Sequence, residues 1–159
     1  MKITILCVGK IKDSFYREAI AEYGKRLQKY CNFQICEVAD EKTPDKASKA
    51  EEELIKKKEG ERILAKLKPE DFVCTLEIEG KRYTSEAFAK MIDTAAISGK
   101  SHIIFIIGGS LGLHDMVCKR GNISLSFSDF TFPHQLMRVI LSEQIYRGFR
   151  IIHGEPYHK

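Results

Sequence analysis

Three glycines follow the most continuously apolar stretch of the chain, in the segment FIIGGSLGLHD at residues 105–115. Glycine allows a tight turn or a close approach of backbone to a ligand, because it carries no side chain. The order Gly108-Gly109-Ser-Leu-Gly112 does not fit the GxGxxG fingerprint of dinucleotide sites, which normally follows a first strand. A phosphate-binding loop is also a poor fit, because no lysine follows until Lys119. A structural turn and a ligand-binding loop both stay open.

A second unusual segment, LSFSDFTFPHQLMRVILSEQ at residues 125–144, places aromatic rings among small polar residues. Phe127, Phe130 and Phe132 alternate with Ser, Asp and Thr in a stretch too broken for a strand. Such a loop either fills the core with its rings or forms a wall for a flat apolar ligand whose edge is read by backbone groups.

Both segments follow predicted strands, so the elements of the chain decide whether they meet. Apolar runs predict strands at 2–8, 33–38, 71–77, 102–109 and 123–127, and helical patterns occupy 14–30, 46–67, 85–97, 114–120 and the stretch from Pro133 to about 152. Ser14 is the expected cap of the first helix, Gly60 is expected to interrupt the second, and IEGKR at 78–82 reads as a turn. Alternating strands and helices predict an α/β fold with a largely parallel sheet. The two loops would then share one cleft at the carboxyl ends of neighbouring strands.

Composition sets broad limits on the function. The 159 residues fit a single domain spanning 1–159, and the net charge of +4 permits an acidic partner such as RNA without requiring one. The five cysteines include no CxxC pair and are expected to be reduced, with Cys7, Cys36 and Cys74 inside apolar runs. We expect no metal site, no membrane span and no signal peptide, and hence a cytoplasmic protein.

Several segments together resemble one family. VGK near the start, TLEIEGK, FIIGGSLGL, LSFSDFTFPHQLMRVILSEQIYRGFRI and the terminal GEPYHK are similar to the bacterial SPOUT-class methyltransferases of large-subunit ribosomal RNA. The resemblance covers the whole chain in one register.

That resemblance implies properties that the residues alone do not. The fold would contain a deep C-terminal trefoil knot, and the working unit would be a homodimer. The activity would be methylation of N3 of a pseudouridine in large-subunit ribosomal RNA on assembled ribosomes, with S-adenosyl-L-methionine as the methyl donor. The implied cofactor contacts are Leu76, Gly108, Phe127, Ser128, Asp129, Phe130, Thr131 and Phe132.

Methylation of an imide nitrogen requires loss of its proton, so a base or a group that stabilises the anion is needed. The tail residues Tyr157 and His158 are candidates, because an aromatic ring can stack on a base and a histidine can handle its proton. A frayed tail is the alternative, but the resemblance implies that the Tyr-His pair approaches the active site, that of the partner subunit. Arg138 is the candidate for contacting RNA phosphate or the uracil anion.

Other polar residues of the last helix have plainer expected roles. Glu143 and Arg147 are spaced for an ion pair one helical turn apart, on a surface facing solvent or a partner. His134 is expected to cap or pack at the start of the helix, and His114, after the glycine loop, fits either a structural or a functional role.

Two other functions compete with this interpretation. One is another nucleotide-using α/β enzyme, such as a transferase or hydrolase, and the other is a non-catalytic, ribosome-associated RNA-binding module. Binding of S-adenosyl-L-methionine, ATP and NAD distinguishes the first, and methyl incorporation into ribosomes distinguishes the second.

Overall fold

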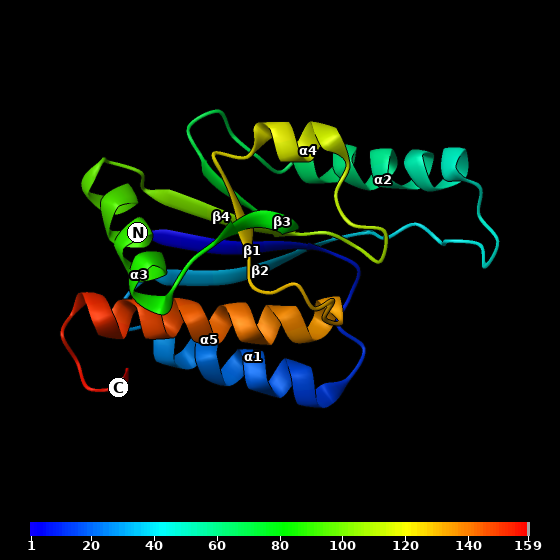
Figure 1. Cartoon of the computed structure of the whole chain (residues 1–159). Coiled ribbons are helices and arrows are strands. Elements are labelled where there is room, and N and C mark those ends of the chain that lie inside the picture. The colour runs from blue at the N-terminus through cyan, green and yellow to red at the C-terminus, as the bar shows by residue number, and fades with distance from the viewer. Residues whose placement is uncertain (159) are drawn as a thin grey trace.

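Five parallel strands form a single sheet in the computed structural model, which describes residues 1–158 (Figure 1). Their order across the sheet is β2-β1-β4-β3-β5. The strands are β1 (Lys2–Val8), β2 (Asn32–Val38), β3 (Phe72–Arg82), β4 (His102–Ile107) and β5 (Ile123–Ser126). The apolar run HIIFII of β4 lies at the centre of the sheet, between β1 and β3. An all-parallel sheet of this kind confirms the predicted α/β class.

Helices cover both faces of the sheet. They are α1 (Ser14–Leu27), α2 (Lys49–Leu64), α3 (Ser85–Ile97), α4 (Asp115–Arg120) and α5 (His134–Ile152). One face carries α1, α3 and α5, with α5 packed against the other two, and the opposite face carries α2 and α4 (Figure 1). No helix in residues 1–158 has the length and apolar character needed to cross a membrane.

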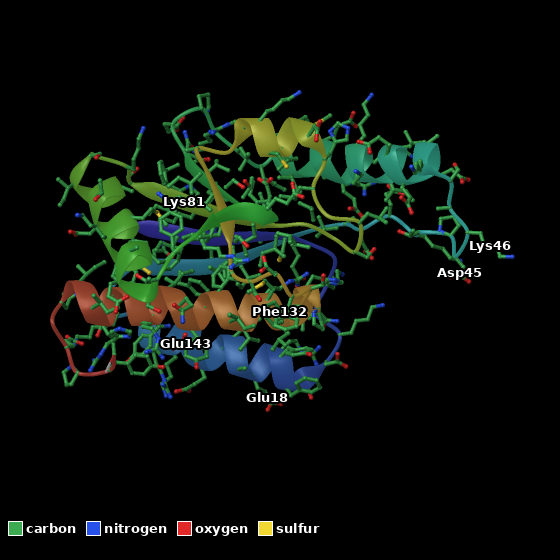
Figure 2. All side chains as sticks on the ribbon, in the orientation of Figure 1. Glu18, Asp45, Lys46, Lys81, Phe132 and Glu143 are labelled. Atoms are coloured by element: carbon green, nitrogen blue, oxygen red, sulfur yellow. The ribbon has the colours of Figure 1, made fainter. Side chains whose placement is uncertain are left out.

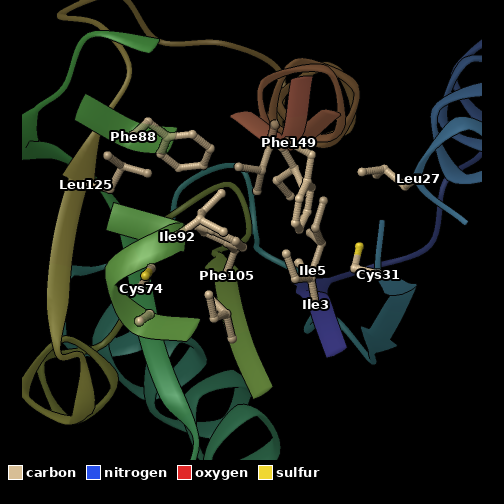
Figure 3. Packing of buried hydrophobic residues seen from close by; sticks show 14 of the residues in the cluster. Ile3, Ile5, Leu27, Cys31, Cys74, Phe88, Ile92, Phe105, Leu125 and Phe149 are labelled. Carbon is tan, nitrogen blue, oxygen red and sulfur yellow. The ribbon is translucent and has the colours of Figure 1, made fainter. Parts of the chain in front are cut away.

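Two apolar cores lie on the two faces. The larger one joins Ile3, Ile5 and Phe105 of the sheet to Phe88 of α3 and Phe149 of α5 (Figure 3). The smaller one lies under α2 and α4. The predicted burial of the thiols holds for two cysteines within the sheet, Cys7 and Cys74, whereas Cys36 is half-buried. Burial raises the pKa of the Cys7 and Cys74 thiols to about 12, so both are protonated at neutral pH.

Helix α2 differs from the expectation, because it runs through Gly60 without interruption. A Cβ on Gly60 would lie 3.2 Å from Cγ2 of Val117 and 3.3 Å from Cβ of His114. Gly60 therefore allows α4 to pack closely on α2. The helix begins with a capping box in which Ser48 and Glu51 satisfy each other's backbone amides. At α1 the N-cap is Asp13 rather than the predicted Ser14, with no side-chain hydrogen bond.

Strand β3 is also longer than expected, since the predicted turn at 78–82 is part of the strand. Both Leu76 and Lys81 are paired with Leu125 of β5, so the residues between them form an irregularity in the ladder. A Cβ on Gly80 would lie 2.7 Å from the carbonyl carbon of Leu125. Gly80 thus permits the backbone of β5 to lie close to the last residues of β3. The trefoil knot implied by the resemblance stays a prediction.

Candidate functional site

A pocket opens at the carboxyl ends of β3, β4 and β5, against the start of α5. We call it the loop pocket. It is lined by Leu76, Glu77, Ile78, Ile107, Gly108, Gly109, Ser110, Gly112, Leu125, Phe127, Ser128, Phe130, Thr131, Phe132, His134 and Met137. The glycine segment and the aromatic segment, about fifteen residues apart in the sequence, face one cavity, as predicted. The strands that they follow are not the neighbours expected, because β3 lies between β4 and β5.

The glycine segment forms a tight turn that closes on itself. The amide of Gly112 donates a hydrogen bond of 3.1 Å to the carbonyl of Gly109, and Gly112 has a φ of +81°. A Cβ on Gly108 would lie 2.8 Å from the carbonyl carbon of Gly112. The structural and the ligand-binding interpretations are therefore compatible, because the glycines make the turn and the turn forms one wall of the pocket.

The aromatic segment forms the opposite wall. Ser128 fixes its shape by accepting a hydrogen bond of 3.0 Å from the amide of Phe130. The side chain of Phe130 is 79 % exposed, so this ring is available to cover a ligand. Asp129, predicted as a cofactor contact, does not line the pocket and instead pairs with Arg82 of β3 at the surface.

Electrostatically the loop pocket suits a ligand without phosphates. Its lining residues include no Lys or Arg, and Glu77 is the one carboxylate among them. Glu77 accepts a hydrogen bond of 2.6 Å from Thr75. Aromatic and aliphatic side chains supply most of the remaining wall, which is the composition expected around a flat heterocycle.

The position of Arg138 does not fit the predicted contact with RNA. Its side chain is fully buried, and its guanidinium donates to the carbonyls of Val8 (2.7 Å) and Gly9 (2.9 Å) and to Glu37 (3.0 Å). These bonds tie α5 to the ends of β1 and β2. Nε of Arg138 is buried without a partner within residues 1–158. In this structure Arg138 holds the frame beside the pocket and is not accessible to phosphate.

The tail containing Tyr157 and His158 packs on its own chain, away from the loop pocket. The Tyr157 hydroxyl donates to Glu143 (3.1 Å), and the His158 ring contacts Glu86 (2.6 Å) and Arg147 (3.3 Å). Glu143 lies farther along α5 than Phe132, which precedes the helix (Figure 2). Glu143 comes nine positions after His134, so the tail sits about 14 Å along the helix from the pocket.

A carboxylate anchors the chain just before this tail. Glu155 accepts from Lys29 at 2.7 Å and also pairs with Tyr30 and Arg150. The hydrogen bond from Lys29, followed by the one from Tyr30, lowers the pKa of Glu155 to about 2. The predicted Glu143–Arg147 ion pair is present, with a separation of 2.7 Å.

The sequence interpretation missed one wall of the loop pocket, the start of α5. His134 and Met137 line the pocket, and His134 does not cap the helix, because the N-cap is Pro133. Their spacing of three residues places both on one helical face, which is the signal that could have identified them. His114 does cap α4, since its ring accepts from the Met116 amide at 3.1 Å.

Comparison with known proteins gives consistent results. A family model described as "Predicted SPOUT methyltransferase" matches residues 1–158. The chain is 58 % identical to the ribosomal RNA large subunit methyltransferase H of Clostridium beijerinckii and 55 % identical to that of Clostridium acetobutylicum, each over the full length of both proteins. A solved structure described as a "probable methylase family protein" from Haemophilus influenzae Rd KW20 aligns with a TM-score of 0.54 and 13 % identity. That alignment covers 99 % of this chain and 70 % of the other, and it shows a shared fold.

Proposed function

The chain belongs to the SPOUT methyltransferase family and is a methyltransferase of large-subunit ribosomal RNA, and we propose that it transfers a methyl group from S-adenosyl-L-methionine to N3 of a pseudouridine in that RNA. One observation carries the proposal. Leu76 of β3, Gly108 after β4 and the residues of the loop at 127–132 other than Asp129 line a single cavity. These are the positions that the sequence resemblance assigns to the cofactor.

The walls of the loop pocket fit this cofactor. Rings such as Phe127 and Phe132 offer apolar surface to an adenine, and the glycine turn brings backbone amides and carbonyls close to its edge. A positively charged sulfonium is compatible with the Glu77 carboxylate and with the absence of Lys and Arg from the described lining. ATP would bring several negative charges to the same place, which argues against a nucleotide-phosphate enzyme.

The protein's contribution to the reaction is mainly placement. S-adenosyl-L-methionine supplies an activated methyl group, and displacement from sulfur needs no further activation of that carbon. The turn at 108–112 and the aromatic loop would hold the donor, and the exposed ring of Phe130 would exclude water from it. Fixing donor and acceptor in line converts an encounter of two molecules into a step within one complex.

We propose a homodimer as the working unit, with each tail serving the site of the other subunit. Neither Tyr157 nor His158 lines the loop pocket of its own chain. A second copy could present these residues to the pocket, where Tyr157 would stack on the RNA. Burial, followed by the charge of Glu143, raises the pKa of Tyr157 to about 12, so its hydroxyl stays neutral during the reaction.

Mass spectrometry of large-subunit ribosomal RNA tests the activity directly. Ribosomes from a strain lacking the gene should lack one N3-methylated pseudouridine, and purified protein with S-adenosyl-L-methionine should restore it. Ribosome binding without methyl incorporation would support the RNA-binding module instead. We also propose that the protein acts in the cytoplasm on assembled ribosomes, in which case intact ribosomes should be better substrates than naked RNA.

Isothermal titration calorimetry tests the cofactor separately. S-adenosyl-L-methionine and S-adenosylhomocysteine should bind the protein, whereas ATP and NAD should not. Binding of ATP in preference to the sulfonium would support another nucleotide-using transferase.

A further inference from the structure

A second cavity, of about 470 Å³, lies at the carboxyl ends of β1 and β2, next to the start of α5. We call it the lysine pocket. Lys10 and Lys12 line it from the segment after β1, Glu37 and Asp40 from the end of β2, and His134 and Gln135 from α5. Its volume exceeds that of the loop pocket, which is about 190 Å³. None of the residues proposed as cofactor contacts lines it.

The two cavities share one lining residue, His134. A ligand in the lysine pocket and a ligand in the loop pocket would therefore approach each other beside His134. The rim is held in place by local bonds: Gln135 accepts a hydrogen bond of 2.9 Å from the Lys12 amide, and Arg138 ties down the carbonyl of Gly9. The pocket is thus formed by anchored backbone at the ends of two strands.

The lysine pocket has the chemistry of a nucleotide site. Lys10 and Lys12 are exposed at its rim, where they can pair with phosphates of an RNA strand. The carboxylate of Asp40, an exposed residue of the pocket lining, can accept from the N–H groups of a base. The lysine ammonium groups and the carboxylate acceptor together match an extruded base with its flanking phosphates, since a base must leave its stack before an enzyme can reach its ring atoms.

We propose that the lysine pocket receives the target base and that His134, where the two cavities meet, accepts the proton that the base loses. This inference rests on the proposed methyl transfer to N3. The N3–H bond breaks and its proton passes to a ring nitrogen of His134. N3 forms a bond to the methyl carbon, and the carbon–sulfur bond of the donor breaks with its electron pair left on sulfur. The imidazolium then releases its proton to water.

His134 has its ring nitrogens available for this role. Both ring nitrogens of His102 are engaged, by Asp71 and Thr4, while His114 caps α4 and His153 contacts the carbonyl of Phe149. His158 is bound to Glu86 and Arg147. In residues 1–158 the ring of His134 makes no such hydrogen bond.

The charge state of His134 also suits a proton acceptor. Burial, aided by the positive charges of Arg138 and Lys12, lowers its pKa, and Asp40 opposes this only in part. Lys10 and Glu37 complete the charged groups around the lysine pocket. Because the pKa lies below the ordinary value of 6.5, the imidazole is neutral at pH 7 and can take up a proton.

The pH dependence of single-turnover methylation of ribosomes tests the role of His134. In the wild type the rate should be constant near pH 7 and fall as pH drops through the pKa of His134. His134→Gln should lower the rate at pH 7 by about 10²–10⁴-fold, the usual effect of one general base. The variant's rate should rise with pH, because hydroxide increasingly ionises the imide without help. Its dissociation constant for S-adenosyl-L-methionine should stay within about threefold of the wild type.

The matched control is His153→Gln, which removes an exposed histidine at the other end of α5 and should keep the wild-type profile. Equal rates and equal pH profiles for His134→Gln and wild type would overturn the inference and leave the proposed function intact. A wild type that methylates no ribosomal nucleotide would instead overturn the proposed function, and the pocket would then be judged by binding alone.

Binding of a single-stranded RNA oligonucleotide containing pseudouridine tests the pocket without any turnover. Titration should shift the imidazole ¹⁵N signals of His134 in labelled protein and leave those of His153 in place. The double variant Lys10→Ala/Lys12→Ala should make the plot of log affinity against log salt concentration shallower by about 1.4, because each phosphate contact to single-stranded RNA contributes about 0.7. The control pair Lys57→Ala/Lys58→Ala, on the exposed face of α2, should not change the slope. Unchanged His134 signals together with an unchanged slope for the Lys10/Lys12 variant would exclude the lysine pocket as the RNA site.

Discussion

Arg138 of α5 and Glu37 of β2 form an ion pair of 3.0 Å in which the arginine side chain is fully buried. The same guanidinium holds the carbonyls of Val8 and Gly9, so one side chain connects the last helix to two strand ends. A residue expected from the sequence to face RNA thus supports the wall between the two pockets.

Arg138→Ala should destabilise the fold by about 2–5 kcal/mol, because it removes a fully buried side chain and leaves two buried backbone carbonyls without their partner. Urea unfolding followed by circular dichroism measures this. Arg26→Ala removes an exposed ion pair with Glu22 on α1 and should cost no more than about 1 kcal/mol. A similar small loss for both variants would contradict the structural role of Arg138.

Gly108→Ala should abolish cofactor binding, since even a methyl group would lie 2.8 Å from the Gly112 backbone and force the turn open. Calorimetric titration with S-adenosyl-L-methionine measures the loss, and circular dichroism verifies that the variant is folded. Gly24→Ala is the matched control. Its Cβ would make an ordinary contact of 3.6 Å with Phe33, so binding should be unchanged. A folded Gly108→Ala protein with normal affinity would show that this turn does not hold the cofactor.

Deletion of residues 157–159 should cut methylation of ribosomes by about 5–150-fold while leaving folding and cofactor affinity nearly intact, because it removes the stacking of Tyr157 on the RNA, and one such stack is worth about 1–3 kcal/mol. Light scattering should show that the truncated protein is still a dimer. Mixing truncated chains with Gly108→Ala chains tests the arrangement: a mixed dimer has one intact pocket facing one intact tail, so activity should return. Full turnover by the truncated protein would exclude any role for the tail.

Glu59 should make stability depend on pH. It is 5 % exposed and accepts from the Glu41 amide at 3.0 Å, and burial raises its pKa. A raised native pKa stabilises the fold fully below the unfolded value, near 4.3, and this contribution is lost as pH rises through the native pKa. Glu59→Gln stays neutral, so its free energy of unfolding relative to wild type should increase between pH 4 and pH 7.

Urea titrations at several pH values measure this difference. Lys57→Gln, an exposed substitution on the same helix that changes no carboxyl, should show a constant difference from wild type. A constant difference for Glu59→Gln as well would mean that its carboxyl is not held in its buried position.

Local sequence patterns were sufficient to predict the helices and strands and the meeting of the two loops. Apolar runs and glycines constrain the backbone conformation of the segment in which they occur. Features set by distant packing could not be predicted in this way. Gly60 looks like a helix breaker until Val117 is seen against it, and Gly80 looks like a turn until the backbone of Leu125 is seen beside it. Arg138 looks like a surface cation, because its carbonyl partners at Val8 and Gly9 precede it by about 130 residues. His134 was missed as a pocket residue because the strand ends that form the pockets with it are also distant in the sequence.

The contacts of Glu155 with Lys29, Tyr30 and Arg150 limit the distance that the tail can reach when two copies of the chain associate. Beyond that anchor only Pro156, Tyr157 and His158 lead to the histidine, and three fully extended residues span about 10 Å. If the anchor holds, a tail that serves a partner's site must find it within that radius of Glu155. Dimer arrangements that place the partner's His134 farther than this from Glu155 are therefore excluded. Cross-linking of a His158→Cys variant would map the permitted arrangements.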